Sequence, residues 1–126
     1  MNIPGNLKYT NDHEWVLVDG NLGTIGVTDY AQGELGDVVF VDIDPNISEI
    51  KKGDSVGTIE AVKTVSDMYA PFTGKVVEVN SALSSNPEII NSDPYGDGWM
   101  LKVEIDNPSE LDELLDADGY KALIGQ

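Results

Sequence analysis

The sequence predicts a mainly β domain with helices at its C-terminus, and two observations carry this prediction. Its apolar residues fall in short, β-branched or alternating runs separated by glycine, proline, asparagine and aspartate, which is the pattern of strands and turns. From about residue 107 to 124 the pattern becomes helical. The 126 residues contain no linker, low-complexity tract or clear repeat, so residues 1–126 are expected to form one domain.

The strands are expected in order along the chain. Asp19-Gly20-Asn21 is a turn sequence between two strand-like runs, so the first two runs should form a hairpin. The expected strand-rich runs are 13–19, 22–28, 37–43, 50–62, 64–80 and 99–105. The polar stretch over 80–98 is expected to be a loop with one helical turn.

Helices are expected where capping residues precede an apolar pattern. Thr28 should cap a short helix over 29–36, closed by Gly33 or Gly36. Asn107 should cap a C-terminal helix, and a second short helix should follow over 119–125. The first of these C-terminal helices should carry one apolar stripe, made by Leu111, Leu114 and Leu115.

The charge balance excludes several kinds of partner. Twenty-three acidic residues face seven lysines and no arginine, a formal net charge of −16 that repels nucleic acid. This acidity serves solubility or steers the chain toward basic docking patches, and the composition favours neither. There is no cysteine for disulfide or thiol chemistry. Neither a membrane span nor a signal or transit peptide is visible, so a bacterial-type cytoplasmic location is expected.

No catalytic or metal-binding constellation stands out. His13 is the only histidine, and no local motif supplies a serine or ligand partner, so a structural or surface role is favoured. The stretch from Asp93 to Glu104 half-matches a calcium loop, but Tyr95 occupies a ligand position and a strand follows where a helix is required. We therefore expect no metal and no enzymatic activity.

Lys63 is the residue whose position in the sequence suggests a function. It lies between two strand-rich runs, at the expected tip of a hairpin within about 54–80, and its neighbours Ala61, Val62 and Thr64 are uncharged. An acyl chain joined to this amine would become a long arm with a fixed root. An ordinary solvated lysine is the alternative.

The segment "VGTIEAVKTVSDMYAPFTGKVVEVN" resembles the lipoylation segment of the glycine cleavage system H protein family. The segments "LKYTNDHEWV", "GTIGVTDYAQGELGDVVFVD", "NPEIINSDPYGDGWMLKV" and "PSELDELLDADGY" are similar to that family in the same order, so the likeness covers nearly the whole chain. It implies a flattened β-barrel or sandwich of the lipoyl/biotinyl (hammerhead-hybrid) type. It also implies that the protein is a carrier and not an enzyme.

The resemblance assigns roles by position. Lys63 matches the lysine that carries lipoate through an amide, and Glu60 and Gly74 match residues that lipoylating enzymes read. Glu14 matches a position that lines the cleft where the loaded arm rests. Asp67, on the strand just past Lys63, and Asp12, at a neighbouring position where some family members have serine, are expected to add charge there. Ordinary solvated strand acids are the alternative for Glu14 and Asp67. The chain departs from the family at Ala61 and Thr64, where serine and alanine are common.

The implied function is to carry an aminomethyl group on the lipoyl arm. A pyridoxal-phosphate-dependent glycine decarboxylase loads it, a tetrahydrofolate-dependent aminomethyltransferase unloads it, and dihydrolipoamide dehydrogenase reoxidises the dithiol. Lipoyl-attaching enzymes are further partners, a lipoyl-relay role is possible in the family, and a monomer is expected. The alternatives are a biotinyl carrier domain, although Val62 and Thr64 replace the usual methionines, and a cofactor-free β interaction domain.

Overall fold

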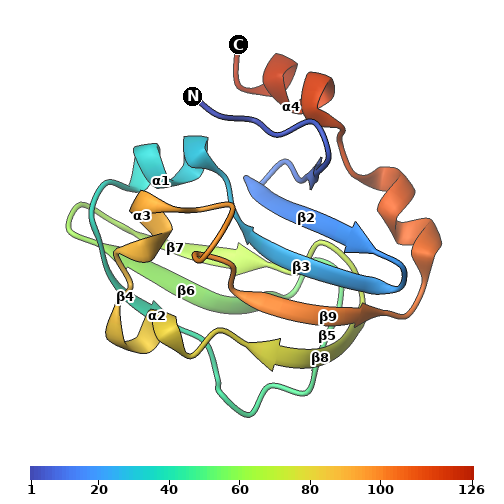
Figure 1. Ribbon diagram of the computed structural model, residues 1–126, viewed down its shortest axis with the longest axis horizontal. Helices are drawn as coiled ribbons and strands as arrows, with labels where there is room; N and C mark the ends of the chain where they lie inside the picture. The colour runs from blue at the N-terminus through green and yellow to red at the C-terminus, as the bar shows by residue number, and fades with distance from the viewer.

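The computed structural model describes all of residues 1–126 and contains two antiparallel sheets (Figure 1). The six-stranded sheet has the order β1-β2-β3-β9-β8-β5, and the three-stranded sheet has the order β4-β6-β7. The strands are β1 (Lys8–Tyr9), β2 (Glu14–Asp19), β3 (Leu22–Val27), β4 (Val38–Asp42), β5 (Glu49–Ile50), β6 (Ser55–Ala61), β7 (Val65–Tyr69), β8 (Gly74–Val79) and β9 (Leu101–Ile105). The predicted fold class is confirmed: the two sheets form a flattened sandwich rather than a closed barrel.

Local sequence signals placed the first hairpin and helix correctly. Asp19 pairs with Leu22, which leaves Gly20 and Asn21 as the turn, and Gly20 has the positive φ (62°) that such turns require. The Thr28 side chain accepts from the Ala31 N–H and caps α1 (Asp29–Leu35). Of the two expected ends, the helix uses Gly36, whose N–H donates to the Gln32 carbonyl.

The long polar loop contains two short helices instead of the single helical turn expected. These are α2 (Ala82–Ser85) and α3 (Ile89–Ser92). The strand after the loop starts at Leu101 rather than Trp99, because the Trp99 N–H still donates back to the Gly96 carbonyl.

The prediction for the C-terminal segment is wrong in part. Pro108–Glu113 is a 3₁₀ helix, η1, capped by Asn107 as expected, but it ends before Leu114. Leu115 instead forms a β-bridge with Tyr9, so the three leucines do not make one helical stripe. The last helix, α4 (Ala117–Leu123), starts earlier than expected because the Asp116 side chain caps it.

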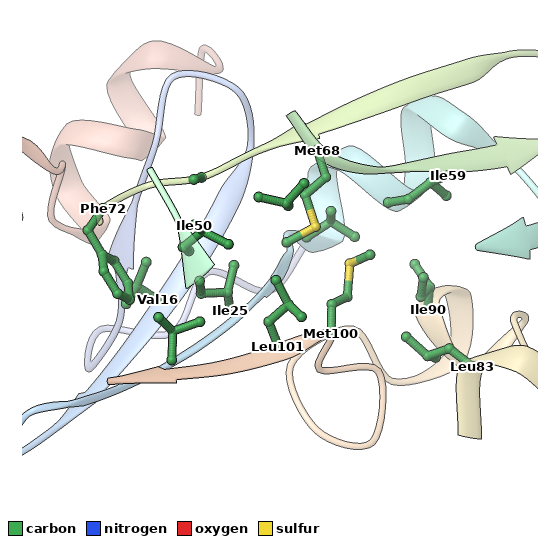
Figure 2. Close-up of a cluster of buried hydrophobic side chains, with 14 of the residues drawn as sticks. Val16, Ile25, Ile50, Ile59, Met68, Phe72, Leu83, Ile90, Met100 and Leu101 are labelled. Atoms are coloured by element: carbon green, nitrogen blue, oxygen red, sulfur yellow. The ribbon is translucent and has the colours of Figure 1, made fainter. Parts of the chain in front are cut away.

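The core lies between the two sheets and fixes the hairpin that carries Lys63. Figure 2 shows side chains of both sheets meeting there, with Met68 of β7 pointing toward Met100 and Leu101, and Ile59 of β6 lying opposite Ile90. A second, smaller cluster of Leu7, Tyr9, Trp15 and Tyr120 joins the C-terminal helix to the N-terminal segment. Because Ile59 and Met68 are buried, the residues that alternate with them, among them Glu60, face solvent.

Candidate functional site

Lys63 lies at the exposed turn between β6 and β7, and the turn is held at its root. The Ala61 N–H donates to the Thr64 carbonyl (2.8 Å) and closes the turn. The Val62 N–H donates to the Asp37 carbonyl (3.0 Å), which attaches the turn to the α1–β4 connection. Figure 1 shows this hairpin end lying beside α1 and α3. The predicted hairpin is confirmed, and the lysine leaves it from a fixed base.

Gly36 lies beneath the Lys63 side chain. A Cβ atom added to Gly36 would come within 2.7 Å of Lys63 Cε, and the glycine backbone has φ 76° and ψ −155°. Asn91 of α3 fixes this connection, since its Nδ2 donates to the Gly36 carbonyl (2.8 Å) and its Oδ1 accepts from the Val38 N–H (2.9 Å). Sequence reasoning assigned Gly36 only to the helix end and missed its contact with the lysine.

A cleft of about 220 Å³ runs between α1 and β7, next to the Lys63 turn. Three of its acidic lining residues come from two segments far apart in the sequence: Asp12 and Glu14 lie where the chain enters β2, and Asp67 lies on β7. Glu34 of α1 adds a further acid. Its apolar lining residues are Val27, Ala31, Leu35, Ile59 and Val65. The structure therefore brings together all three acids that the sequence placed in a cleft.

Glu14 is not a solvated strand acid, because its side chain is only 2 % exposed. Its Oε1 accepts from the Thr10 hydroxyl (2.6 Å), and its Oε2 accepts from the Tyr69 N–H (3.2 Å). Burial raises the pKa of Glu14 to about 7, although both hydrogen bonds favour the charged form. The carboxyl group thus joins β2 to β7 and is poised to gain or lose a proton near neutral pH.

Asp67 and Asp12 differ from Glu14 in that both are exposed. The Asp67 Oδ1 accepts from the Ser55 hydroxyl on β6 (3.3 Å). The backbone N–H of Asp12 donates to the Thr10 hydroxyl oxygen (3.2 Å), so Thr10 organises both Asp12 and Glu14. Of the three acids, Glu14 alone is held in place by burial.

His13 connects the cleft to the end of the chain. Its backbone has φ 68°, the only positive value outside glycine, and its Nδ1 lies 2.8 Å from the Tyr120 hydroxyl. That hydroxyl lies 2.7 Å from Thr28 Oγ1, the cap of α1. Burial lowers the pKa of His13, so a neutral ring can accept from Tyr120 while Tyr120 accepts from Thr28. The structural role expected for His13 agrees with this network.

The two residues assigned to recognition lie in different environments. Glu60 is exposed on β6, directly opposite Val65. Gly74 is buried at the start of β8 in the other sheet, paired with Ile105. A Cβ atom on Gly74 would overlap the carbonyl oxygen of Glu104, so close strand packing, and not a positive φ, excludes a side chain there.

Two further observations concern metal binding and membrane-spanning helices. No group of three or more histidine and acidic residues is placed to hold a metal ion, and Asp93 instead accepts from the Asp97 N–H within its loop (2.9 Å). No helix in the structure is both long enough and apolar enough to cross a bilayer.

A two-sheet β domain that presents a lysine at the turn of a hairpin, beside an acidic cleft, has the features of a carrier domain of the lipoyl/biotinyl class. The glycine cleavage H-protein family model matches residues 7–126. The chain therefore belongs to that family, which supports the role of a lipoyl carrier in the glycine cleavage system and does not favour the biotinyl or cofactor-free alternatives.

Individual relatives agree with this assignment. The chain is 55% identical over 126 residues to a glycine cleavage system H protein of Staphylococcus haemolyticus, covering 100% of both chains. It is 53% identical over 124 residues to that of Bacteroides fragilis, covering 98% of both. A crystal structure of a glycine cleavage system H protein from Mycobacterium marinum is similar with a TM-score of 0.89 and 40% identity, covering 98% of this chain and 100% of that one.

Proposed function

We propose that Lys63 carries the lipoyl group and that the cleft beside it holds the cargo of the arm. The observation that carries this proposal is the position of Lys63, exposed on a held turn and adjacent to a cleft with acidic and apolar walls. Attachment forms an amide: the Lys63 amine attacks an activated lipoyl carbonyl, the activating group leaves, and a proton is released. When bound, the lipoyl group would supply a disulfide whose S–S bond breaks as two electrons arrive, so that one sulfur takes the aminomethyl group and the other becomes a thiol.

The lining of the cleft suits such an arm. Apolar residues such as Leu35 and Ile59 can contact the methylene chain, whereas Glu14 faces the space where a cationic amine would rest. A carboxylate beside the amine favours its protonated form, and protonation removes the lone pair that would assist loss of the cargo. The cation in turn favours the ionised form of Glu14. Asp67 and Asp12, which are exposed, add negative charge at the margin.

In this proposal the chain is a carrier and not a catalyst. Its partners are the pyridoxal-phosphate-dependent glycine decarboxylase, the tetrahydrofolate-dependent aminomethyltransferase, dihydrolipoamide dehydrogenase and the lipoyl-attaching enzymes. Glu60 and Gly74 belong to the surface and the sheet that the last of these enzymes engage. We expect the chain to act as a monomer. The relay of lipoate to other acceptors and the cytoplasmic location stay predictions.

Intact mass spectrometry and peptide mapping after expression with lipoate test the proposal. We expect one lipoyl adduct, on Lys63. Lys63→Arg should abolish lipoylation and glycine cleavage with little change in stability, since an exposed turn substitution costs little. Lys51→Arg, at another exposed lysine in a turn region, is the matched control and should be lipoylated normally. A biotin adduct, or lipoate on a lysine other than Lys63, would contradict the proposal.

A further inference from the structure

An apolar patch lies on the outside of the three-stranded sheet and reaches the turn that carries Lys63. Eight large apolar side chains of the molecule are exposed, and four of them lie on β4 or beside the Lys63 turn. These four, which we call the outer patch, are Val39 (53 % exposed), Phe40 (49 %), Val62 (72 %) and Val65 (57 %). Single exposed apolar residues are ordinary, but a contiguous group of them marks an interaction surface.

The strand register places Phe40 and Val65 of the patch on one face. Phe40 pairs with Glu60, and Glu60 pairs with Val65, so these three side chains form a row across β4, β6 and β7. The neighbours of Glu60 on β6, Ile59 and Ala61, are buried, so the row faces outward. The register shifts between Val38 and Phe40, and this bulge leaves Val39 exposed beside Phe40.

The charges around the outer patch define a partner of complementary chemistry. Glu60 lies in the middle of the row, between Phe40 and Val65. On the side away from the Lys63 turn, Thr58 pairs with Asp42 on β4 and with Asp67 on β7. The patch therefore has an acidic margin. A partner that covers this face needs an apolar depression for Phe40 and the valines, and basic groups opposite Glu60 and the margin.

The position of the patch selects one kind of enzyme. Before modification, the amine of Lys63 reaches only one lysine side chain beyond the turn, so an enzyme that acylates it must bring its active site onto this surface. Once the arm is attached, enzymes that act on its far end can dock farther away. Val62 is next to Lys63 in the chain, and the patch is thus continuous with the acceptor itself.

We propose that the outer patch, with Glu60 at its centre, is the docking surface for the enzyme that attaches the lipoyl group to Lys63. This inference rests on the proposed function and adds to it a binding surface on β4, outside the hairpin. Phe40 and Val39 contribute through binding, and neither takes part in the acylation chemistry.

The test compares variants that remove apolar surface without leaving the strand. The substrates Val39→Thr and Phe40→Thr are each incubated with a lipoate ligase, lipoate and ATP. Phe40→Leu, which keeps an apolar side chain, is assayed in parallel. Val77→Thr is the matched control, because Val77 is 60 % exposed on β8 of the other sheet. We expect the KM for the acceptor protein to rise about tenfold in Phe40→Thr and several-fold in Val39→Thr, with kcat unchanged. Phe40→Leu should recover most of the affinity, and Val77→Thr should match wild type.

A second measurement does not depend on the variants. In the wild-type protein, the methyl signals of Val39, Val62 and Val65 should broaden or shift when the ligase is added without ATP, while those of Val77 should stay unchanged. Unaltered patch methyls, or equal KM values for wild type and Phe40→Thr, would overturn the inference and leave the carrier function intact. Normal lipoylation of Phe40→Thr with impaired loading by the decarboxylase would also overturn it, because the patch would then serve another enzyme. Failure of wild-type Lys63 to accept lipoate would overturn both proposals.

Discussion

The aliphatic stem of Lys63 lies over Gly36, so close that a Cβ atom on the glycine would come within 2.7 Å of Lys63 Cε. Gly36 therefore meets two demands at once: a backbone conformation that only glycine adopts readily, and an open surface on which the lysine rests. The direction in which Lys63 leaves the turn thus depends on Gly36, which lies 27 positions earlier in the sequence.

We expect Gly36→Ala to slow lipoylation of the folded protein, because the new methyl group displaces the Lys63 side chain. It should also cost about 1–3 kcal/mol of folding free energy through backbone strain. Gly53→Ala is the control: Gly53 also has a positive φ (88°) but nothing lies within 4 Å of an added Cβ. Lipoylation rates, corrected for the folded fraction from thermal melts, should fall only in Gly36→Ala. Equal rates in both variants would show that the lysine does not depend on the glycine surface.

Glu14 should make stability depend on pH. Its pKa is raised from 4.5 to about 7 in the folded protein, so the folded state holds a proton that the unfolded state releases between these values. This stabilising contribution is complete below about pH 4.5 and is lost as pH rises through 7. Glu14→Gln removes this contribution. The free energy of unfolding of the variant, relative to that of wild type, should therefore rise by up to about 3 kcal/mol from pH 5 to pH 8. Denaturant unfolding at both pH values measures the difference, and a constant offset would contradict the assigned cause.

Glu14 should also protect the cargo better than Asp67 does. Loaded with the aminomethyl group and kept without the transferase, Glu14→Gln should release formaldehyde at least about tenfold faster than wild type, since a nearby carboxylate shifts an amine pKa by about 1–3 units. Asp67→Asn should show a smaller effect, because Asp67 is exposed and bonded to Ser55. If both variants retain cargo as long as wild type, other residues provide the shelter.

Gly74→Ala should act through the sheet. The added methyl group would overlap the backbone of Glu104, and relief requires β8 and β9 to separate, at a cost of about 1–3 kcal/mol or more. Gly33→Ala is the opposite control: it lies in α1 with nothing within 4 Å and should stabilise the helix by about 0.5–1 kcal/mol. Thermal melts measure both. A Gly74→Ala protein that is fully stable yet poorly lipoylated would instead assign the glycine to direct contact with the enzyme.

Local signals in the sequence predicted much of this architecture. Thr28, the Gly20 turn and the strand runs on both sides of Lys63 each act within a few residues, so they can be recognised without knowledge of the fold. The end of the chain could not be predicted in the same way. Leu115 fits a helical stripe locally, but its pairing with Tyr9 makes two backbone hydrogen bonds across more than a hundred residues and determines the actual structure.

The functional site, too, has features that local sequence predicts and features that depend on the tertiary fold. Lys63 and its hairpin were readable from the sequence, and the resemblance to the family placed Glu14 in a cleft to which Asp67 and Asp12 were expected to add charge. The burial of Glu14 could not be read from the sequence, because it depends on the tertiary approach of β7, whose Tyr69 N–H donates to the Glu14 carboxyl group. The contact of Gly36 with Lys63 was equally hidden, since it arises only when the α1–β4 connection packs against the hairpin turn.

The hydrogen bonds of Tyr120 have a consequence for biosynthesis. Tyr120 lies 107 positions after His13 in the sequence, yet its hydroxyl joins His13 to the cap of α1, and its ring stacks on Tyr9. Ribosomes deliver the N-terminal segment first, so His13 must wait until the 107 residues that lead to Tyr120 have been added before this contact can form. A nascent chain that does not yet include Tyr120 can already form the local hairpin of Lys63 while the contacts of Tyr120 with His13 and Thr28 are still missing. We therefore expect the lysine to become accessible for lipoylation earlier in synthesis than the Tyr120 side of the cleft is completed.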